Sequence, residues 1–253
     1  MSGRIIGGSE AKPHSRPYMA YLSIRNVSHE GTCGGFLIRP DAVLSAAHCV
    51  NGTHQSYVSE GKVAIIVILG AHNVYKELSW QVFHIKHWVI HPNYSRDIDE
   101  NYIMLLKLNL KAKKTKEVSP IDLPSHNEQV KPETTCEVAG WGDTSIPSKM
   151  PSVLMKADLK VQRGEVCKAS FNNDYLEQSM ICVGDEDGNK ASFKGDSGGP
   201  LVCNGKAHGI VSYGPKYCIF PEVFTRVSYF EPWIRQELRK FALQVLPDSP
   251  SSD

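Results

Sequence analysis

Short apolar stretches separated by turn residues recur along this chain, and they constrain its fold more than any other feature. Stretches of this kind indicate short β-strands, and many of them at close spacing favour an all-β sandwich or barrel. No longer internal repeat is evident, so a solenoid or propeller is not expected. The clearest apolar stretches are residues 19–24, 35–38, 63–69, 103–108, 153–161 and 210–213.

Two regions carry periodic patterns of their own. Near the C-terminus, Pro232 suits a first helical turn, and apolar residues follow it at helical spacing. We therefore predict a helix over residues 231–245 that packs against the body of the protein, followed by a disordered tail over residues 247–253. Residues 81–90 alternate in part, which predicts a strand with one face formed by Val82, His84, Lys86 and Trp88.

The composition is that of an ordinary globular protein. The chain has 253 residues, of which 41% are hydrophobic and 22% are charged, and this length allows one or two domains with buried cores. A net charge of +1 argues against a field that attracts nucleic acid. The longest apolar run, residues 63–71, is too short to span a bilayer. We therefore expect a monomer without a membrane span or a nucleic-acid partner.

Cysteines and glycosylation acceptor patterns together favour an exported protein in an oxidising compartment. No two cysteines form a CxxC pair, which argues against zinc-ribbon and thioredoxin-like sites. Residues 1–4 hold no apolar stretch and hence no signal peptide, and a cytosolic protein with reduced cysteines is the alternative. The acceptor asparagines are Asn26, Asn51 and Asn93. The seven cysteines are Cys33, Cys49, Cys136, Cys167, Cys182, Cys203 and Cys218.

Three local motifs follow one another in the chain. Arg4 precedes the run Ile5-Ile6-Gly7-Gly8, and Ala46-Ala47-His48-Cys49 comes next. The third motif lies far downstream and reads Gly195-Asp196-Ser197-Gly198-Gly199-Pro200. A lone histidine is more often structural than catalytic, but chance does not explain the conjunction of all three motifs.

The residue types in these motifs suit nucleophilic catalysis. A serine hydroxyl is a poor nucleophile until a base removes its proton, and the imidazole of His48 can act as that base near neutral pH. Glycines beside Ser197 let the backbone approach a substrate carbonyl. The amides of Gly195 and Ser197 can then stabilise an oxyanion. The motifs therefore predict that Ser197 is a nucleophile.

With these motifs, the chain resembles the chymotrypsin family of serine proteases over residues 5–246. The resemblance implies an all-β fold of two six-stranded antiparallel β-barrels, over about residues 5–115 and 116–230, with a C-terminal helix. It places His48 on the first barrel and Ser197 on the second, with the active site in the cleft between them. It implies no cofactor. No metal site is expected either, because spacing does not put His84, His87 and His91 on one strand face.

The resemblance also implies activation by cleavage and three disulfides. Cleavage after Arg4 frees the amine of Ile5, which inserts and pairs with Asp196, so a chain that retains residues 1–4 is a zymogen. Cys218 is left over, because Phe193 occupies its usual partner position, and it is a free thiol, an intermolecular linker or a small buried hydrophobe. The implied disulfides are Cys33–Cys49, Cys136–Cys203 and Cys167–Cys182.

One position departs from the family pattern. An aspartate should stand just before the strand Ile103-Met104-Leu105-Leu106, where it holds the tautomer of the catalytic histidine, and this chain has Tyr102 there. A phenol can form a hydrogen bond but supplies no negative charge. The nearby carboxylates could replace it after a loop shift or could be solvated loop charges, and they are Asp97, Asp99 and Glu100.

The same resemblance defines a substrate pocket. Ala191 would lie at its base, where trypsin-like members carry an aspartate, and Glu222 would point in from the far wall. This pattern resembles the subgroup of granzymes, mast-cell chymases and cathepsin G, which implies a preference for aromatic residues or Lys/Arg. Glu222 would accept the basic residues, or it is held by local hydrogen bonds alone. The other implied pocket residues are Ser192, Ser212, Tyr213 and Gly214.

Two functional hypotheses follow from these observations. The first is a secreted or granule serine endopeptidase with weakened catalysis, whose partners are protein or peptide substrates and protein protease inhibitors. The second is a pseudoprotease that keeps the fold as a binding or signalling module. A local lysine cluster is a candidate heparin contact or a solvated loop, and it consists of Lys111, Lys113, Lys114 and Lys116.

Overall fold

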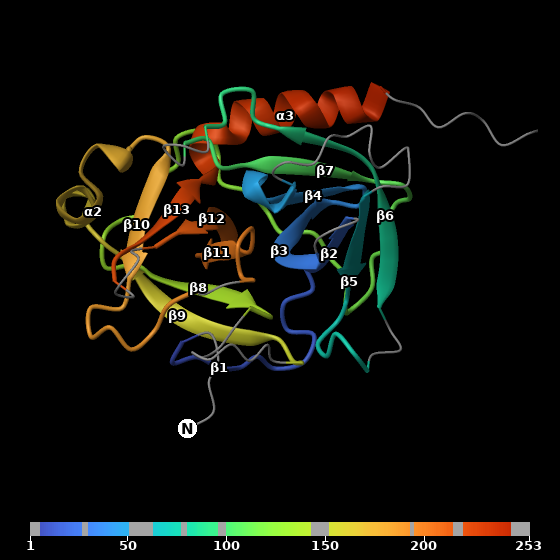
Figure 1. The fold of residues 1–253 in the computed structure, drawn as a ribbon, viewed down its shortest axis with the longest axis horizontal. Coiled ribbons are helices and arrows are strands. Elements are labelled where there is room, and N and C mark those ends of the chain that lie inside the picture. The colour runs from blue at the N-terminus through green and yellow to red at the C-terminus, as the bar shows by residue number, and fades with distance from the viewer. Residues whose placement is uncertain are drawn as a thin grey trace, which may run out of the picture.

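Two β-barrels lie next to each other, and a long helix packs along one side of the molecule (Figure 1). This arrangement confirms the predicted all-β fold with a C-terminal helix. No helix in the described part of the chain is long and apolar enough to cross a membrane. The computed structural model describes residues 6–26, 30–50, 63–76, 80–95, 100–142, 152–192, 195–214 and 220–243.

The first barrel is a closed ring in the order β2-β3-β4-β7-β6-β5, and the pairing of β2 with β5 closes it. Apolar residues at alternate positions point inward, and Leu22, Val43 and Val67 are completely buried in its core. Its strands are β2 (Met19–Asn26), β3 (Glu30–Arg39), β4 (Ala42–Ser45), β5 (Val63–Leu69), β6 (Gln81–Ile90) and β7 (Met104–Leu108).

The second barrel runs in the order β9-β10-β13-β12-β11-β8, and the pairing of β8 with β9 closes it. Strand β1 (Ser9–Glu10) adds to the edge of β9, with Ser9 opposite Lys156. The N-terminal segment, which the resemblance assigns to the first barrel, therefore pairs with a strand of the second. The ring strands are β8 (Thr135–Gly140), β9 (Met155–Val161), β10 (Met180–Gly184), β11 (Pro200–Cys203), β12 (Lys206–Tyr213) and β13 (Glu222–Arg226).

Strand β6 does not keep the single face that its alternation predicts. Val82 is exposed, whereas Trp88 is buried in the barrel core. The pairing of β6 with β7 shifts register between Ile85 and His87. Such an irregularity reverses the side-chain alternation, so the residues before and after it face opposite ways.

Four helical segments complete the described fold: η1 (Ala47–Val50), α2 (Gly164–Phe171), η2 (Asn172–Asp174) and α3 (Val227–Leu243). Helix α3 begins at Val227 rather than at residue 231, so Pro232 lies inside it. Proline leaves the carbonyl four residues earlier, that of Ser228, without its helical donor. The amide of Asn127 donates to this carbonyl at 3.1 Å. The neighbouring loop therefore satisfies the helix at the point where proline would otherwise end it.

Helix α3 joins the two halves of the molecule. It follows β13 of the second barrel, and its C-terminal end packs on the first. Arg39 of β3 donates to the carbonyl of Leu238 at 2.9 Å, and the ammonium of Lys107 in β7 donates to the carbonyl of Phe241. The carbonyl of Phe241 lies in the last turn of α3, where carbonyls lack helical donors and cationic side chains stabilise them.

Three disulfides confirm the implied pairing. Cys33–Cys49 links β3 to η1 in the first barrel, whereas Cys136–Cys203 and Cys167–Cys182 lie in the second. Disulfides of this kind constrain the unfolded chain and are typical of proteins from oxidising compartments. Cys218 lies outside the described residues.

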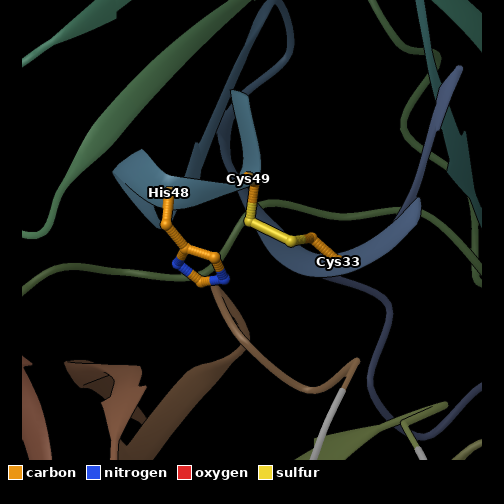
Figure 2. A group of neighbouring side chains, drawn as sticks. All are labelled: Cys33, His48 and Cys49. Carbon is orange, nitrogen blue, oxygen red and sulfur yellow. A yellow bond between two sulfur atoms is a disulfide. The ribbon is translucent and has the colours of Figure 1, made fainter. Parts of the chain in front are cut away.

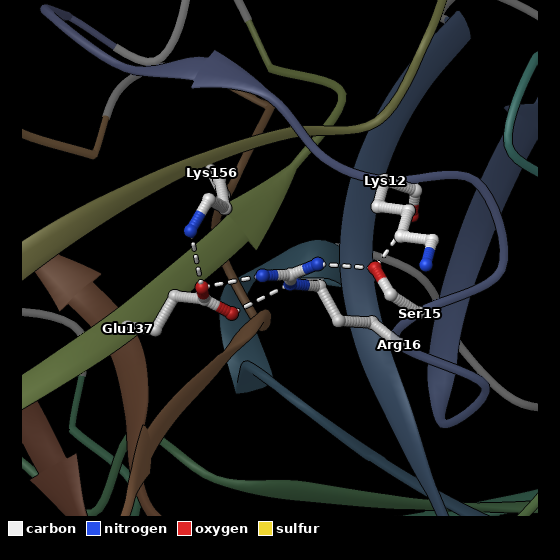
Figure 3. A network of polar contacts seen from close by, with 5 residues as sticks. All are labelled: Lys12, Ser15, Arg16, Glu137 and Lys156. Atoms are coloured by element: carbon white, nitrogen blue, oxygen red, sulfur yellow. Dashed lines mark hydrogen bonds and ion pairs between the residues drawn. The ribbon is translucent and has the colours of Figure 1, made fainter.

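A charged network fastens the segment after β1 to the second barrel (Figure 3). Arg16 donates two hydrogen bonds to the carboxylate of Glu137 in β8, and Lys156 of β9 donates to the same carboxylate at 3.1 Å. Burial raises the pKa of Glu137, but the bonds and charges of Arg16 and Lys156 outweigh burial and hold that pKa below its ordinary value. The ionised form of Glu137 is thus the one that stabilises the fold.

We predict that Glu137→Gln lowers the free energy of unfolding by about 1–3 kcal/mol, because Arg16 then loses a charged acceptor in a part-buried site. Glu133→Gln is the matched control, since Glu133 pairs with Lys160 on the surface and should contribute less than about 0.5 kcal/mol. Urea unfolding at neutral pH measures both.

The same stabilisation should fade as the pH falls. The folded pKa of Glu137 lies below its unfolded value, so its contribution is complete above the unfolded pKa and is lost on titration through the folded one. The difference between the native protein and Glu137→Gln should therefore shrink in acid. Equal effects of the two substitutions at neutral pH would contradict this account.

Candidate active site

His48 lies on η1, directly after β4. Its neighbour Cys49 forms the disulfide with Cys33 of β3, so the short helix that carries the imidazole is fastened to an adjacent strand (Figure 2). The two sulfurs and one imidazole nitrogen lie within 4.8 Å of one another. Because the sulfurs are bonded to each other, they offer no thiolate to a metal ion. The disulfide instead fixes the backbone at His48.

Tyr102 packs flat against His48. Their ring centroids are 4.8 Å apart and the ring planes differ by 25°. Tyr94 contacts the Tyr102 ring in turn, at 5.7 Å and 63°. The Nδ1 atom of His48 is buried and has no hydrogen-bond partner among the described residues. The phenol therefore meets the face of the imidazole, where a family aspartate would meet its Nδ1 edge.

The nearby carboxylates are only partly within the described structure. Glu100 pairs through its backbone with Ser95 in both directions, at 3.1 and 3.2 Å. Asp97 and Asp99 lie outside the described residues. Burial lowers the pKa of His48 to about 4, and no charged group within the described residues opposes this effect. The imidazole is thus neutral at pH 7, free to accept a proton but weakly basic.

The backbone at Ser197 is held between the two barrels. The amide of Gly34 in β3 donates to the carbonyl of Ser197 at 2.9 Å, and the amide of Gly198 donates to the carbonyl of Val211 in β12 at 3.1 Å. Gly198 has φ +87°, and a Cβ there would lie 2.3 Å from the hydroxyl of Ser45. Only glycine therefore fits at this crossing of the barrels.

Asp196, the residue before Ser197, is buried, with 1% of its surface exposed. The amide of Gly142 donates to its Oδ1 at 2.9 Å. A Cβ on Gly140 would lie 2.0 Å from the same oxygen, so glycine makes room for the carboxylate. The predicted activation cleaves after Arg4 and pairs the freed amine of Ile5 with Asp196, and both Arg4 and Ile5 lie outside the described residues. The arrangement provides a buried, negatively charged site next to Ser197.

Residues of the predicted substrate pocket come together around Glu222. Glu222 lies on β13 with 4% of its surface exposed. Its carboxylate accepts the amide of Ser192 at 3.1 Å from each oxygen, and also the hydroxyl of Ser192. Ala191 is buried beside Ser192, and a Cβ on Gly214 would lie 3.7 Å from Cγ of Glu222.

Burial raises the pKa of Glu222 to about 8. The hydrogen bonds from Ser192 act in the opposite direction, and the charge of Asp196 adds to the increase. Glu222 is therefore mostly protonated at pH 7 and becomes charged in mild alkali. The described contacts agree with the alternative of a glutamate held by local hydrogen bonds.

The comparisons with known proteins agree with this geometry. The family model named Trypsin matches residues 5–234. The chain belongs to the trypsin family of serine proteases. It is 47% identical to Duodenase-1 of Bos taurus over 244 aligned residues, and the alignment covers 96% of this chain and 92% of that protein. It is 45% identical to cathepsin G of Homo sapiens over 250 aligned residues, and this alignment covers 98% of this chain and 93% of that protein.

Further relatives give the same result. Granzyme B(G,H) of Mus musculus is 48% identical over 239 residues, with 94% and 92% of the two chains covered. A solved structure described as "Structure of GrC" is 44% identical and has a TM-score of 0.84, with 92% and 99% covered. The expected family and subgroup are therefore confirmed, and so is the two-barrel fold.

Within this trypsin-family fold, sequence reasoning missed two contacts of the site. The amide of Gly34 holds the carbonyl of Ser197. The position of Gly34 next to Cys33 is the one signal in the sequence that could have indicated this contact. Tyr94 supports the Tyr102 ring, and no pattern in the chain pointed to it.

The remaining predicted residues have contacts and surroundings of their own. Asn93 is exposed, Asn51 lies outside the described residues, and Asn26 is described only as backbone in β2. Tyr213 donates its hydroxyl to the carbonyl of Asp174 at 2.8 Å, and Ser212 is buried in β12. The four lysines of the predicted heparin contact are all exposed: Lys111, Lys113, Lys114 and Lys116.

Proposed function

We propose that the protein is a serine endopeptidase in which Ser197 is the nucleophile and His48 is the general base. The observation that carries this proposal is the Ser197 loop, held by Gly34 against the barrel that also carries His48. Membership of the trypsin family supports the same conclusion.

The reaction follows from the groups in their proposed roles. His48 takes the proton of the Ser197 hydroxyl while the oxygen bonds to the peptide carbonyl carbon. The amides of Gly195 and Ser197 donate to the oxyanion. His48 then returns the proton to the leaving amine, and an acyl-enzyme remains until water hydrolyses it. No cofactor takes part in this sequence.

Catalysis should be slow because His48 faces Tyr102 instead of a carboxylate. In serine proteases, replacing the triad aspartate by asparagine lowers turnover about 10⁴-fold, or about 5.5 kcal/mol of barrier. The low pKa of His48 adds to this loss, because a base with a pKa of about 4 binds the proton of serine weakly. Some catalysis remains through the oxyanion hole and substrate binding.

Activation by cleavage after Arg4 is part of the proposal. The carbonyl of Ile6 accepts the amide of Ala191 at 3.2 Å, and a Cβ on Gly7 would lie 1.9 Å from the carbonyl oxygen of Asn189. The chain just after the cleavage point thus already packs beside the pocket.

The setting of the enzyme follows from its surface and its disulfides. Three disulfides favour an oxidising compartment, so we infer a secreted or granule protein that acts on protein substrates and meets protein protease inhibitors. Exposed Asn93 is the best-supported glycan acceptor in the described residues. The exposed lysines at 111–116 are our candidate for a heparin contact.

A binding module without activity is the second candidate, and the His48–Tyr102 stack favours it. A fluorophosphonate probe on protein cleaved after Arg4 separates the two. The probe bonds through phosphorus to the oxygen of Ser197 and releases fluoride. We expect stoichiometric labelling, absent in the control Ser197→Ala. If the cleaved native protein takes no label, the binding module is the correct account.

Glu222 should make the choice of substrate depend on pH. Below about pH 8 the protonated pocket favours aromatic residues, and above it the ionised carboxylate accepts Lys or Arg. We predict that the ratio of kcat/KM for basic over aromatic peptides rises as pH passes about 8. In Glu222→Gln the ratio should stay low and flat while aromatic substrates are still cleaved. Equal loss of both substrate types would refute this role.

A further inference from the structure

The contact between His48 and Tyr102 has a geometry suited to a cation. With a centroid distance of 4.8 Å and an interplanar angle of 25°, the imidazole lies over the face of the phenol ring rather than at its edge. The face of an aromatic ring carries the negative part of its quadrupole and attracts a cation within about 6 Å. An imidazolium at His48 would therefore lie where this attraction acts.

Few other groups can stabilise that imidazolium. Its Nδ1 has no hydrogen-bond partner in the described structure. The Cys33–Cys49 disulfide beside it carries no proton, and Tyr94 lies beyond Tyr102. Among the described residues, burial is the one cause that shifts the pKa of His48, and no charged group there contributes to its titration. In the described part of the chain, the ring of Tyr102 is an aromatic face in direct contact with the imidazole.

We propose that Tyr102 is a positioning residue whose ring face stabilises the imidazolium form of His48 and fixes the plane of the imidazole. The catalytic consequence rests on the proposed endopeptidase function, but the ring–cation contact does not. Tyr94 supports the contact because its ring packs against the Tyr102 ring, with an angle of 63° between the two ring planes. A contact of this kind changes an equilibrium by about 2- to 30-fold, far less than the roughly 10⁴-fold effect of a carboxylate.

Titration of His48 followed by NMR of its ring protons tests the proposal without any need for activity. Tyr102→Phe keeps the ring face and should leave the protonation equilibrium of His48 unchanged. Tyr102→Leu keeps an apolar neighbour but removes the quadrupole, and should disfavour the imidazolium by about 2- to 30-fold. An unchanged or more basic His48 in Tyr102→Leu overturns the proposal, and so does a Phe variant that behaves like Leu.

A second series protects the test if Tyr102→Leu does not fold. Phenylalanines with increasing numbers of fluorine atoms, introduced at position 102, keep the shape of the ring while weakening its quadrupole. The imidazolium of His48 should become less stable with each added fluorine, and a flat series contradicts the proposal.

Asp97→Asn and Asp99→Asn are controls, and a lower pKa of His48 in either would assign the stabilisation to a carboxylate instead.

Peptide hydrolysis by the same variants separates this inference from the proposed function. If the enzyme acts through His48, Tyr102→Leu should lower kcat by about 2- to 30-fold, with KM unchanged and Tyr102→Phe unaffected. If the NMR titration responds as predicted while no variant hydrolyses peptides, the ring–cation contact holds and the endopeptidase function fails.

Discussion

The hydrogen bond from the Gly34 amide to the Ser197 carbonyl joins the two barrels at the point where the chemistry would occur. Gly34 follows Cys33, and the Cys33–Cys49 disulfide fixes the short helix that carries His48. The Ser197 loop and the helix that carries His48 are thus attached to the same part of the first barrel. Their backbones depend on glycines and a disulfide, and none of these contacts uses the residue at position 102.

This independence explains how Tyr102 can occupy the aspartate position within an intact scaffold. The phenol is accommodated as part of an aromatic cluster with Tyr94 and His48. The imidazole of His48 is thus ordered by its contact with Tyr102, and burial lowers its pKa to about 4. A ring face offsets only a small part of what a carboxylate would provide.

Sequence alone predicted the features that local pattern and motif encode. The short apolar runs predicted an all-β sandwich or barrel, and the site motifs stand in the chain itself. The two-barrel arrangement and the disulfides follow from the family resemblance. The start of α3 was missed because Pro232 is tolerated through a loop hydrogen bond from Asn127, which no local pattern reveals. The inverted face of β6 and the pairing of β1 with β9 were missed for the same reason, since both depend on partners distant in sequence.

The candidate site shows the same division. The motifs located His48, Ser197 and the change at Tyr102, but stacking rather than edge-on hydrogen bonding is a tertiary result. Likewise, the bonds from Ser192 to Glu222 join residues 30 positions apart, and the high pKa of Glu222 follows from its burial.

The central claim is that an otherwise competent protease scaffold is limited by the missing carboxylate at position 102. The most direct test is kcat for a peptide substrate in Tyr102→Asp, compared with the native protein after both are cleaved behind Arg4. The account predicts a large gain, approaching the roughly 10⁴-fold effect of the triad carboxylate in related enzymes. A folded Tyr102→Asp protein with no gain would contradict it.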